Sequence, residues 1–128
     1  SIIALVARLF ETVGSVLVVP ESQMDALSAI SGSGPAYVFL LVEQLAAAAR
    51  RLGFAEAEAR TLAEGTFVGA GALLAASGED PAELRRRVTS PNGTTERAIA
   101  VLEEADLAGI LERAALAAVA RARELAAG

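Results

Sequence analysis

The amino-acid sequence predicts an all-α fold, and three observations lead to that prediction. The chain has 128 residues, a length that suits one compact domain, and 54% of them are hydrophobic, which is more than one small helical domain can bury. Only 4% are aromatic whereas alanine is abundant, and this balance favours closely packed helices over a sheet sandwich. Glycines and prolines divide the sequence into segments of helical length.

Composition excludes several kinds of chemistry. Without cysteine or histidine the chain has no disulfide framework, no thiolate, none of the usual metal sites and no histidine acid–base catalysis. All 11 basic residues are arginine, so no lysine is available for a Schiff base. The net charge of −5 argues against nucleic acid and an anionic membrane surface as partners. No signal peptide is recognisable and no apolar run reaches the ~18 residues of a membrane span, so we expect a soluble, cytoplasmic protein.

The N-terminal part is predicted to begin with a helix over residues 2–10, apolar on most sides. Because this pattern starts with the first residues, we expect the chain to be a piece of a longer protein. Residues 15–19 are a β-branched run that should be extended and end at Pro20. A brief helix then opens within residues 21–25, where Ser22 and Asp25 have the spacing of an imperfect capping box.

Two glycines precede the helix expected at the centre of the fold. In Ser31-Gly32-Ser33-Gly34-Pro35 the glycines permit close backbone approach, and the proline stands where a first helical residue should. The helix is predicted from Pro35 to Leu52 and is apolar nearly all round, so it should be buried. Because only the G-x-G part of a dinucleotide-binding fingerprint is present, tight packing explains the glycines better than phosphate binding does.

A longer helix is predicted from Glu56 to Ser77, between two glycine stops. Gly65, Gly69 and Ala72 share one of its faces, and such a stripe of small residues lets another helix approach closely. Each glycine inside a helix costs up to about 1 kcal/mol, so packing must compensate for them.

The clearest local signal is Asp80-Pro81-Ala82-Glu83, which combines an N-cap, a proline at N1 and a glutamate at N3 that can reach back. The short helix that it opens carries Arg85-Arg86-Arg87. A basic triplet can bind a phosphate, but we interpret this one as a solvated face or an ion-pair surface between subunits.

The longest run of small polar residues is Val88 to Arg97, and we expect chemistry here. In the turn Ser90-Pro91-Asn92-Gly93 the proline disfavours a helical Ser90, while the asparagine and glycine tolerate positive φ. Thr94 or Thr95 is expected to cap a helix that continues to Glu104, and a last helix should run from Ala108 to Leu125. A glycine-containing turn before a helix start suits a carboxylate or phosphate, the alternative being a plain loop with an N-cap.

Two motifs together carry a resemblance to a known family. Residues 31–39 (SGSGPAYVF) and residues 88–95 (VTSPNGTT) resemble the C-terminal half of pyrroline-5-carboxylate reductases. The intervening sequence fits as well, through Glu43, Gly69-Ala70 and the S-G-x-x-P pattern that ends at Pro81. The resemblance covers essentially the whole chain.

The resemblance implies a multi-helix domain similar to the C-terminal domain of 6-phosphogluconate dehydrogenase-like reductases, which forms an intertwined homodimer or a higher oligomer. The complete enzymes are NAD(P)H-dependent oxidoreductases of proline biosynthesis that reduce the small molecule 1-pyrroline-5-carboxylate to L-proline. Residues 1–128 would be the single dimerisation and substrate-loop domain, and these residues contain no Rossmann unit for NADPH or NADH. We therefore expect this chain alone to bind no cofactor and to be inactive, with no nucleic-acid or membrane partner.

The resemblance also assigns roles within the loop. Its substrate-binding residues would be Ser90, Pro91, Asn92, Gly93, Thr94 and Thr95. Ser90, Gly93 and Thr94 would hold the substrate carboxylate through backbone N–H and hydroxyl groups. Thr95 would be the catalytic residue, close to the ring nitrogen. This agrees with the interpretation of the loop as an anion site, and no residue is expected to bind a cofactor or a metal.

Three positions depart from the family pattern. The family loop reads S-P-G-G-T-T, with glycine at Asn92, and an acidic residue and a glutamine are usual at Ala47 and Gly65. At Asn92 we expect backbone conformation to be the constraint, rather than close approach to the ligand, because asparagine tolerates the left-handed region. The alternative function is a free-standing or engineered helical homodimerisation module without catalytic activity. The departures favour this alternative, and the intact S-P-x-G-T-T loop favours the reductase.

Overall fold

The computed structural model describes residues 1–12 and 14–128; their regular secondary structure is helical and includes no strand. The elements in order are α1 (Ile2–Glu11), the 3-10 turn η1 (Glu21–Gln23), α2 (Met24–Leu27), the π-helical turn η2 (Ser28–Gly32), α3 (Gly34–Arg51), α4 (Glu56–Ser77), α5 (Pro81–Arg87), α6 (Thr94–Glu104) and α7 (Leu107–Ala127). The all-α prediction is confirmed.

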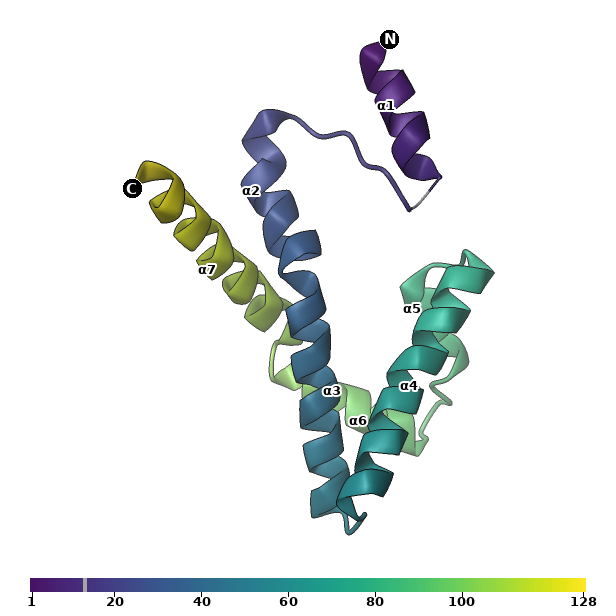
Figure 1. Ribbon diagram of the computed structural model, residues 1–128. Coiled ribbons are helices and arrows are strands. Elements are labelled where there is room, and N and C mark those ends of the chain that lie inside the picture. Colours follow the sequence, from purple (N-terminus) through teal and green to yellow (C-terminus); the bar gives the residue numbers. More distant parts are fainter. Residues whose placement is uncertain (13) are drawn as a thin grey trace.

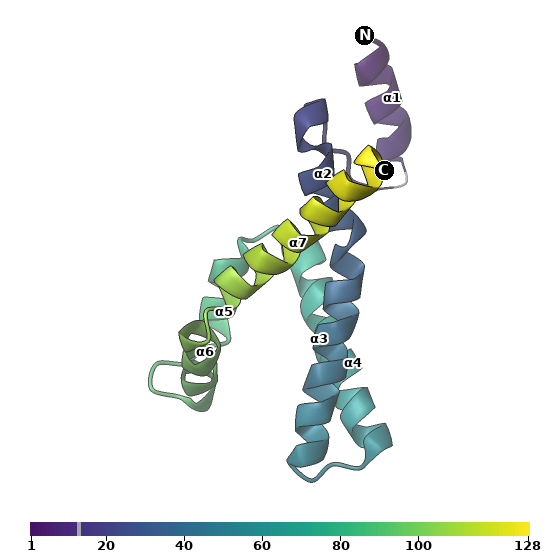
Figure 2. The ribbon, with the colours of Figure 1, turned by 90° about the vertical axis from the view of Figure 1, so that its left-hand side faces the viewer.

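The helices α3 and α4 form a V that is closed at one end and open at the other (Figure 1). Its closed end is the turn at Gly53, whose φ of 108° favours glycine. The helix α7 packs against α2 and η2, whereas α1 stands apart from the other helices in Figure 1. Turned by 90°, the molecule shows α5 and α6 on the far side of the V from α1 (Figure 2).

Alanines make the closest helix contacts. Ala46 of α3 and Ala59 and Ala63 of α4 are buried where the arms of the V meet, because their small side chains let the two backbones approach. The predicted glycine stripe plays no part in this contact. A Cβ added to Gly65 or Gly69 would meet nothing within 4 Å, so within one chain the stripe faces open space.

The prediction of two separate helices before and after residues 31–34 is wrong. Helical structure runs from Glu21 to Arg51, and Gly32 lies within its π-helical turn. Ser33 donates its N–H to the carbonyl of Ser28 at 2.9 Å, and the Tyr37 hydroxyl donates to the carbonyl of Ala29 at 2.8 Å. The expected capping box of Ser22 and Asp25 does not form, because Pro20 takes the N-cap position with extended dihedrals and no side-chain cap is made.

Other predicted helix ends agree with the structure. The helix α4 has the predicted bounds and ends at Gly78 with a φ of 64°. Asp80 accepts a hydrogen bond from the N–H of Ala82 at 2.8 Å, which confirms it as an N-cap. The expected back-reach of Glu83 does not occur, since its carboxylate binds arginines of α5 instead.

Most large apolar side chains in the described part of the chain are exposed, and none of them is buried. The buried hydrophobic residues among those described are Ala29, Ala46, Ala59 and Ala63, whereas Phe39 in α3 is 66% exposed. The expectation that α3 is buried is therefore wrong for a single chain. The accessible surface is 10095 Å². A compact monomer of this size would expose only about 6,300 Å².

One helical run, Glu21–Arg51, is long and apolar enough to cross a membrane by length and composition alone; its most apolar 18 residues have a mean hydropathy of 1.3 and are 6% buried. The run is longer than the sequence predicted because α2, η2 and α3 are continuous. Core helices of soluble proteins pass the same test.

Candidate functional site

The candidate site is the loop between α5 and α6, residues 88–93, together with the first turn of α6. The N–H of Gly93 donates to the carbonyl of Ser90 at 3.0 Å and closes a four-residue turn. Pro91 at its second position and positive φ at its third are features of a type II turn. Asn92 has a φ of 60°, so the expected left-handed conformation is confirmed.

Gly93 matters for its missing side chain rather than for an unusual backbone angle. Its φ of −88° is open to any residue, although the sequence allowed for a positive value. A Cβ at this position would lie 3.1 Å from the carbonyl oxygen of Ser90 and 3.4 Å from its Cβ. The turn therefore closes tightly on Gly93, and a larger residue would push it open.

The expected threonine cap is wrong, because Gly93 itself is the N-cap of α6 and no side chain caps the helix. Thr94 and Thr95 are instead its first two residues. The first N–H groups of an α-helix have no partner within the helix, and they form the positive end of its dipole. The exposed start of α6 therefore presents uncapped N–H groups and two threonine hydroxyls to an anion.

Glu96, which was not among the predicted site residues, ties the loop to the first turn of α6. Glu96, at the third helical position of α6, accepts a hydrogen bond from the backbone N–H of Asn92 through Oε2. A glutamate three residues after an N-cap is the pattern of a capping box, so the sequence contained a signal for this contact.

The helix before the loop is fixed by ion pairs within the chain. Glu83 binds Arg86 at 2.6 Å and Arg87 at 3.1 Å, and Arg87 also binds Glu79 at 3.2 Å. The hydrogen bond from Arg86 lowers the pKa of Glu83 to about 2. The arginines are exposed and Glu83 is only half-buried, so these pairs add little to the stability of the fold. Two arginines of the basic triplet are thus paired with glutamates of the same chain.

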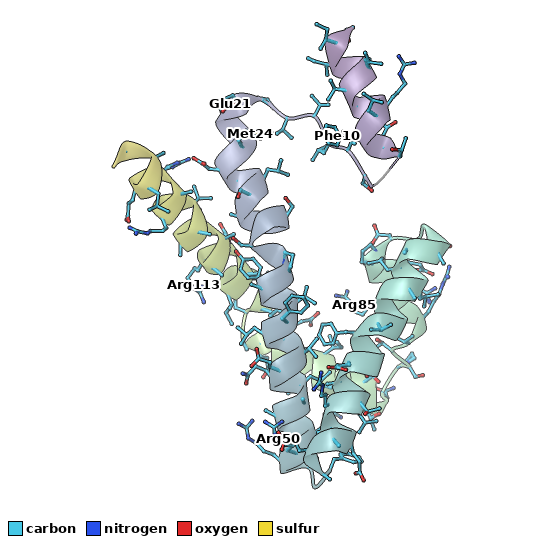
Figure 3. The ribbon with its side chains drawn as sticks, in the orientation of Figure 1. Phe10, Glu21, Met24, Arg50, Arg85 and Arg113 are labelled. Atoms are coloured by element: carbon cyan, nitrogen blue, oxygen red, sulfur yellow. The ribbon has the colours of Figure 1, made fainter. Side chains whose placement is uncertain are left out.

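Two cavities bear on the predicted site residues. One of about 450 Å³ between α5 and α6 is lined by Arg85, Thr89, Pro91 and Glu96, among others. Another of about 460 Å³ between α3 and α4 includes Glu43, Ala47 and Arg50 and shares no residue with the loop. Figure 3 shows Arg50 at the closed end of the V and Arg85 further towards its open end. The structure thus brings residues 90–95 together and leaves Ala47 and Gly65 outside the loop.

Comparison with known proteins identifies similar sequences. Residues 21–125 match a family model described as pyrroline-5-carboxylate reductase dimerisation. A pyrroline-5-carboxylate reductase from Corynebacterium melassecola is 48% identical over 94% of this chain and 44% of that protein. One from Pseudomonas aeruginosa is 47% identical over 83% of this chain and 39% of that protein. The chain spans less than half the length of these relatives.

Solved structures of similar proteins share the fold. A pyrroline-5-carboxylate reductase from Coxiella burnetii matches with a TM-score of 0.87 and 43% identity, over 95% of this chain and 46% of that chain. The pyrroline carboxylate reductase of Plasmodium falciparum, solved with NADP bound, matches with a TM-score of 0.78 and 29% identity, over 92% of this chain and 48% of that one.

Proposed function

The chain belongs to the pyrroline-5-carboxylate reductase family as its dimerisation domain, and we propose that it supplies the dimer interface and the substrate loop of a cytoplasmic NAD(P)H-dependent enzyme that reduces 1-pyrroline-5-carboxylate to L-proline. The observation that carries the proposal is the uncapped start of α6 directly behind the turn Ser90–Gly93. A backbone turn that ends in free helical N–H groups suits the carboxylate of this substrate.

Residues 90–95 form the substrate-binding loop in this proposal. Gly93 already donates its own N–H to Ser90, so its role is to let the turn close without a side chain against Ser90. The N–H groups of Thr94 and Thr95, with the hydroxyls of Ser90 and Thr94, are the donors that hold the carboxylate. Pro91 and Asn92 set the turn that aims them.

Thr95 is the catalytic residue of the proposal. The nicotinamide cofactor, held outside residues 1–128, supplies the hydride when it is bound. As the substrate carbon accepts hydride, the electron pair of the C=N bond moves to the nitrogen, which takes up a proton that comes from water and becomes an amine. A hydroxyl donor beside this increasingly basic nitrogen binds more strongly. An interaction that strengthens towards the transition state lowers the barrier.

A second copy of this chain is the proposed partner. The accessible surface of 10095 Å² and the rows of exposed apolar side chains on α3 and α4 require cover. An intertwined homodimer, in which a second copy buries these faces, supplies it, and the same protein can assemble further into a higher oligomer. The run Glu21–Arg51 is then a core helix of the assembly rather than a membrane span.

The alternative, an engineered module without catalytic function, is not favoured. The relatives that match nearly the whole chain are reductases, and a scaffold has no use for an uncapped helix start behind a tight turn.

A chimera tests the proposal. The 120 matching residues of the Corynebacterium melassecola reductase are replaced by this chain, and proline formation is measured with NADPH. We expect activity from the chimera, and neither NADPH binding nor reduction from this chain alone. The control chimera carries a Gly-Ser loop of equal length at residues 90–95 and should form dimers without activity. A folded, dimeric chimera that fails to reduce the substrate with the loop intact would overturn the proposal.

A further inference from the structure

The loop contains two backbone donors that the chain itself satisfies. The N–H of Gly93 is taken by Ser90, and the N–H of Asn92 is taken by the carboxylate of Glu96. In a usual capping box the glutamate at the third helical position reaches the N–H of the N-cap residue. Here that N–H is already used, and Glu96 reaches one residue further back.

Because Ser90 and Glu96 bind the N–H groups of Gly93 and Asn92, the next N–H groups of the chain have no capping side chain. The helix start has no side-chain cap, so the N–H groups of Thr94 and Thr95 keep their hydrogen-bonding capacity for a ligand. Asn92 is left-handed, with a φ of 60°, and its neighbour Gly93 returns to extended backbone. The bond from Asn92 to Glu96 spans this change of direction and ties the turn to the helix.

We propose that Glu96 is a positioning residue of the substrate loop, which acts by holding the N–H of Asn92 and so fixes the turn against the donors of α6. The inference rests on the proposed function, because it names what aims the donors of that same site. Glu96 touches no substrate in this account and acts only through the backbone of Asn92.

The charge of Glu96 works against this role. Its carboxylate accepts from the Asn92 N–H inside the loop, so it shares the loop with the proposed substrate carboxylate and opposes that anion by Coulomb repulsion. Arg85 lines the same cavity as Glu96, and its positive charge offsets part of that repulsion. A neutral side chain that still accepts the hydrogen bond should therefore position the loop as well and bind the anion at least as tightly.

Glu96→Gln and Glu96→Ala separate the hydrogen bond from the charge. The amide oxygen of glutamine can accept the Asn92 N–H, and alanine cannot. Glu104→Ala, at the far end of α6, is the matched control for removing a carboxylate from the same helix. Circular dichroism shows whether each variant keeps its helices.

Two measurements are made, one on this chain in its native assembly and one on the active chimera. We expect hydrogen exchange at the Asn92 amide to be at least about tenfold faster in Glu96→Ala and unchanged in Glu96→Gln and Glu104→Ala, as for the loss of one charge-assisted bond. In the chimera, Glu96→Ala should raise KM for the substrate about tenfold and leave kcat nearly unchanged, the pattern of lost uniform binding. Glu96→Gln should leave KM unchanged or lower.

An unchanged exchange rate at Asn92 in Glu96→Ala would overturn the inference, and so would a rise in KM for Glu96→Gln equal to that for Glu96→Ala. If the wild-type chimera were inactive, the proposed function would fail, and the exchange rate at Asn92 would still decide whether Glu96 holds the turn.

Discussion

Asn92 is the residue at which backbone conformation and ligand binding meet. Its φ of 60° lies in the left-handed region, where asparagine costs less than other residues with a Cβ. The family loop has glycine here, and either residue satisfies the conformational demand. The close approach falls instead to Gly93, where an added Cβ would press on Ser90.

Substitution of Asn92 should separate conformation from crowding. Asn92→Gly keeps the accessible backbone, so we expect its affinity for proline to stay within about threefold, with stability lowered by roughly 0.4–1 kcal/mol through a looser unfolded chain. Asn92→Val should weaken binding at least tenfold, because a β-branched residue resists positive φ. Calorimetric titration with proline of the wild-type, Asn92→Gly and Asn92→Val dimers makes the comparison. A clear gain in affinity for Asn92→Gly would mean that the asparagine side chain obstructs the loop.

Substitutions of Thr95 and Thr94 should affect different kinetic constants. In the active chimera Thr95→Val keeps the shape of the side chain and removes the donor, and we expect kcat/KM to fall about ten- to a thousandfold, the range for one such hydrogen bond. Thr94→Val should act mainly on KM, because it serves the carboxylate. Steady-state kinetics with pyrroline-5-carboxylate tests both, and an unchanged kcat/KM in Thr95→Val would assign the role to another residue.

Among the elements, α4 packs against α3 with one face and leaves its glycine stripe uncovered. One face places Ala59 and Ala63 against α3 inside the chain. The glycine stripe at Gly65 and Gly69 has open space around it. Glycine in a helix interior is unfavourable unless packing requires it, so this stripe is the part of α4 that the proposed partner should contact.

Gly69→Ala tests whether the stripe faces solvent or a partner helix, because the substitution should be stabilising in the first case and destabilising in the second. At a solvent-facing site the substitution should stabilise the helix by up to about 1 kcal/mol. Against a closely packed partner helix the added methyl group should instead weaken the dimer at least tenfold, and this is what we expect. Gly71→Ala, about 200° round the helix from Gly69, is the control. Sedimentation equilibrium measures the dimer dissociation constant, and tighter association of Gly69→Ala would exclude the stripe from the interface.

Elements with strong local chemistry could be predicted from the sequence. Asp80 with Pro81, and Gly78 with its positive φ, fix helix ends by capping and backbone conformation alone. The stretch at Ser31–Gly34 could not, because glycines fit either a loop or a helix. Here hydrogen bonds within the run decide, among them that of Tyr37 to Ala29 eight residues away.

For the candidate site, the sequence predicts residues 90–95 as an anion loop and a left-handed Asn92, and the backbone angle of Asn92 agrees. The sequence also predicts a threonine as the cap of α6, because threonine side chains cap helices well. The extended backbone of Gly93 takes that position instead, and Glu96 fastens the turn through a contact that depends on where the helix begins.

At the scale of the whole molecule, the described chain lacks a core of large side chains. Its buried hydrophobic residues are four alanines, while residues such as Ile2, Leu52 and Val68 are 81%, 81% and 72% exposed. The surface exceeds that of a compact monomer of this mass by more than a third. Apolar surface of this extent is typical of a protomer whose core is completed by another copy.

Analytical ultracentrifugation across a range of concentrations, combined with chemical unfolding of the same samples, tests this claim most directly. We expect the chain to sediment at twice its mass wherever it is folded, and its unfolding midpoint to rise with protein concentration, because obligate dimers gain stability by mass action. A folded monomer at micromolar concentration, with an unfolding midpoint independent of concentration, would contradict the account.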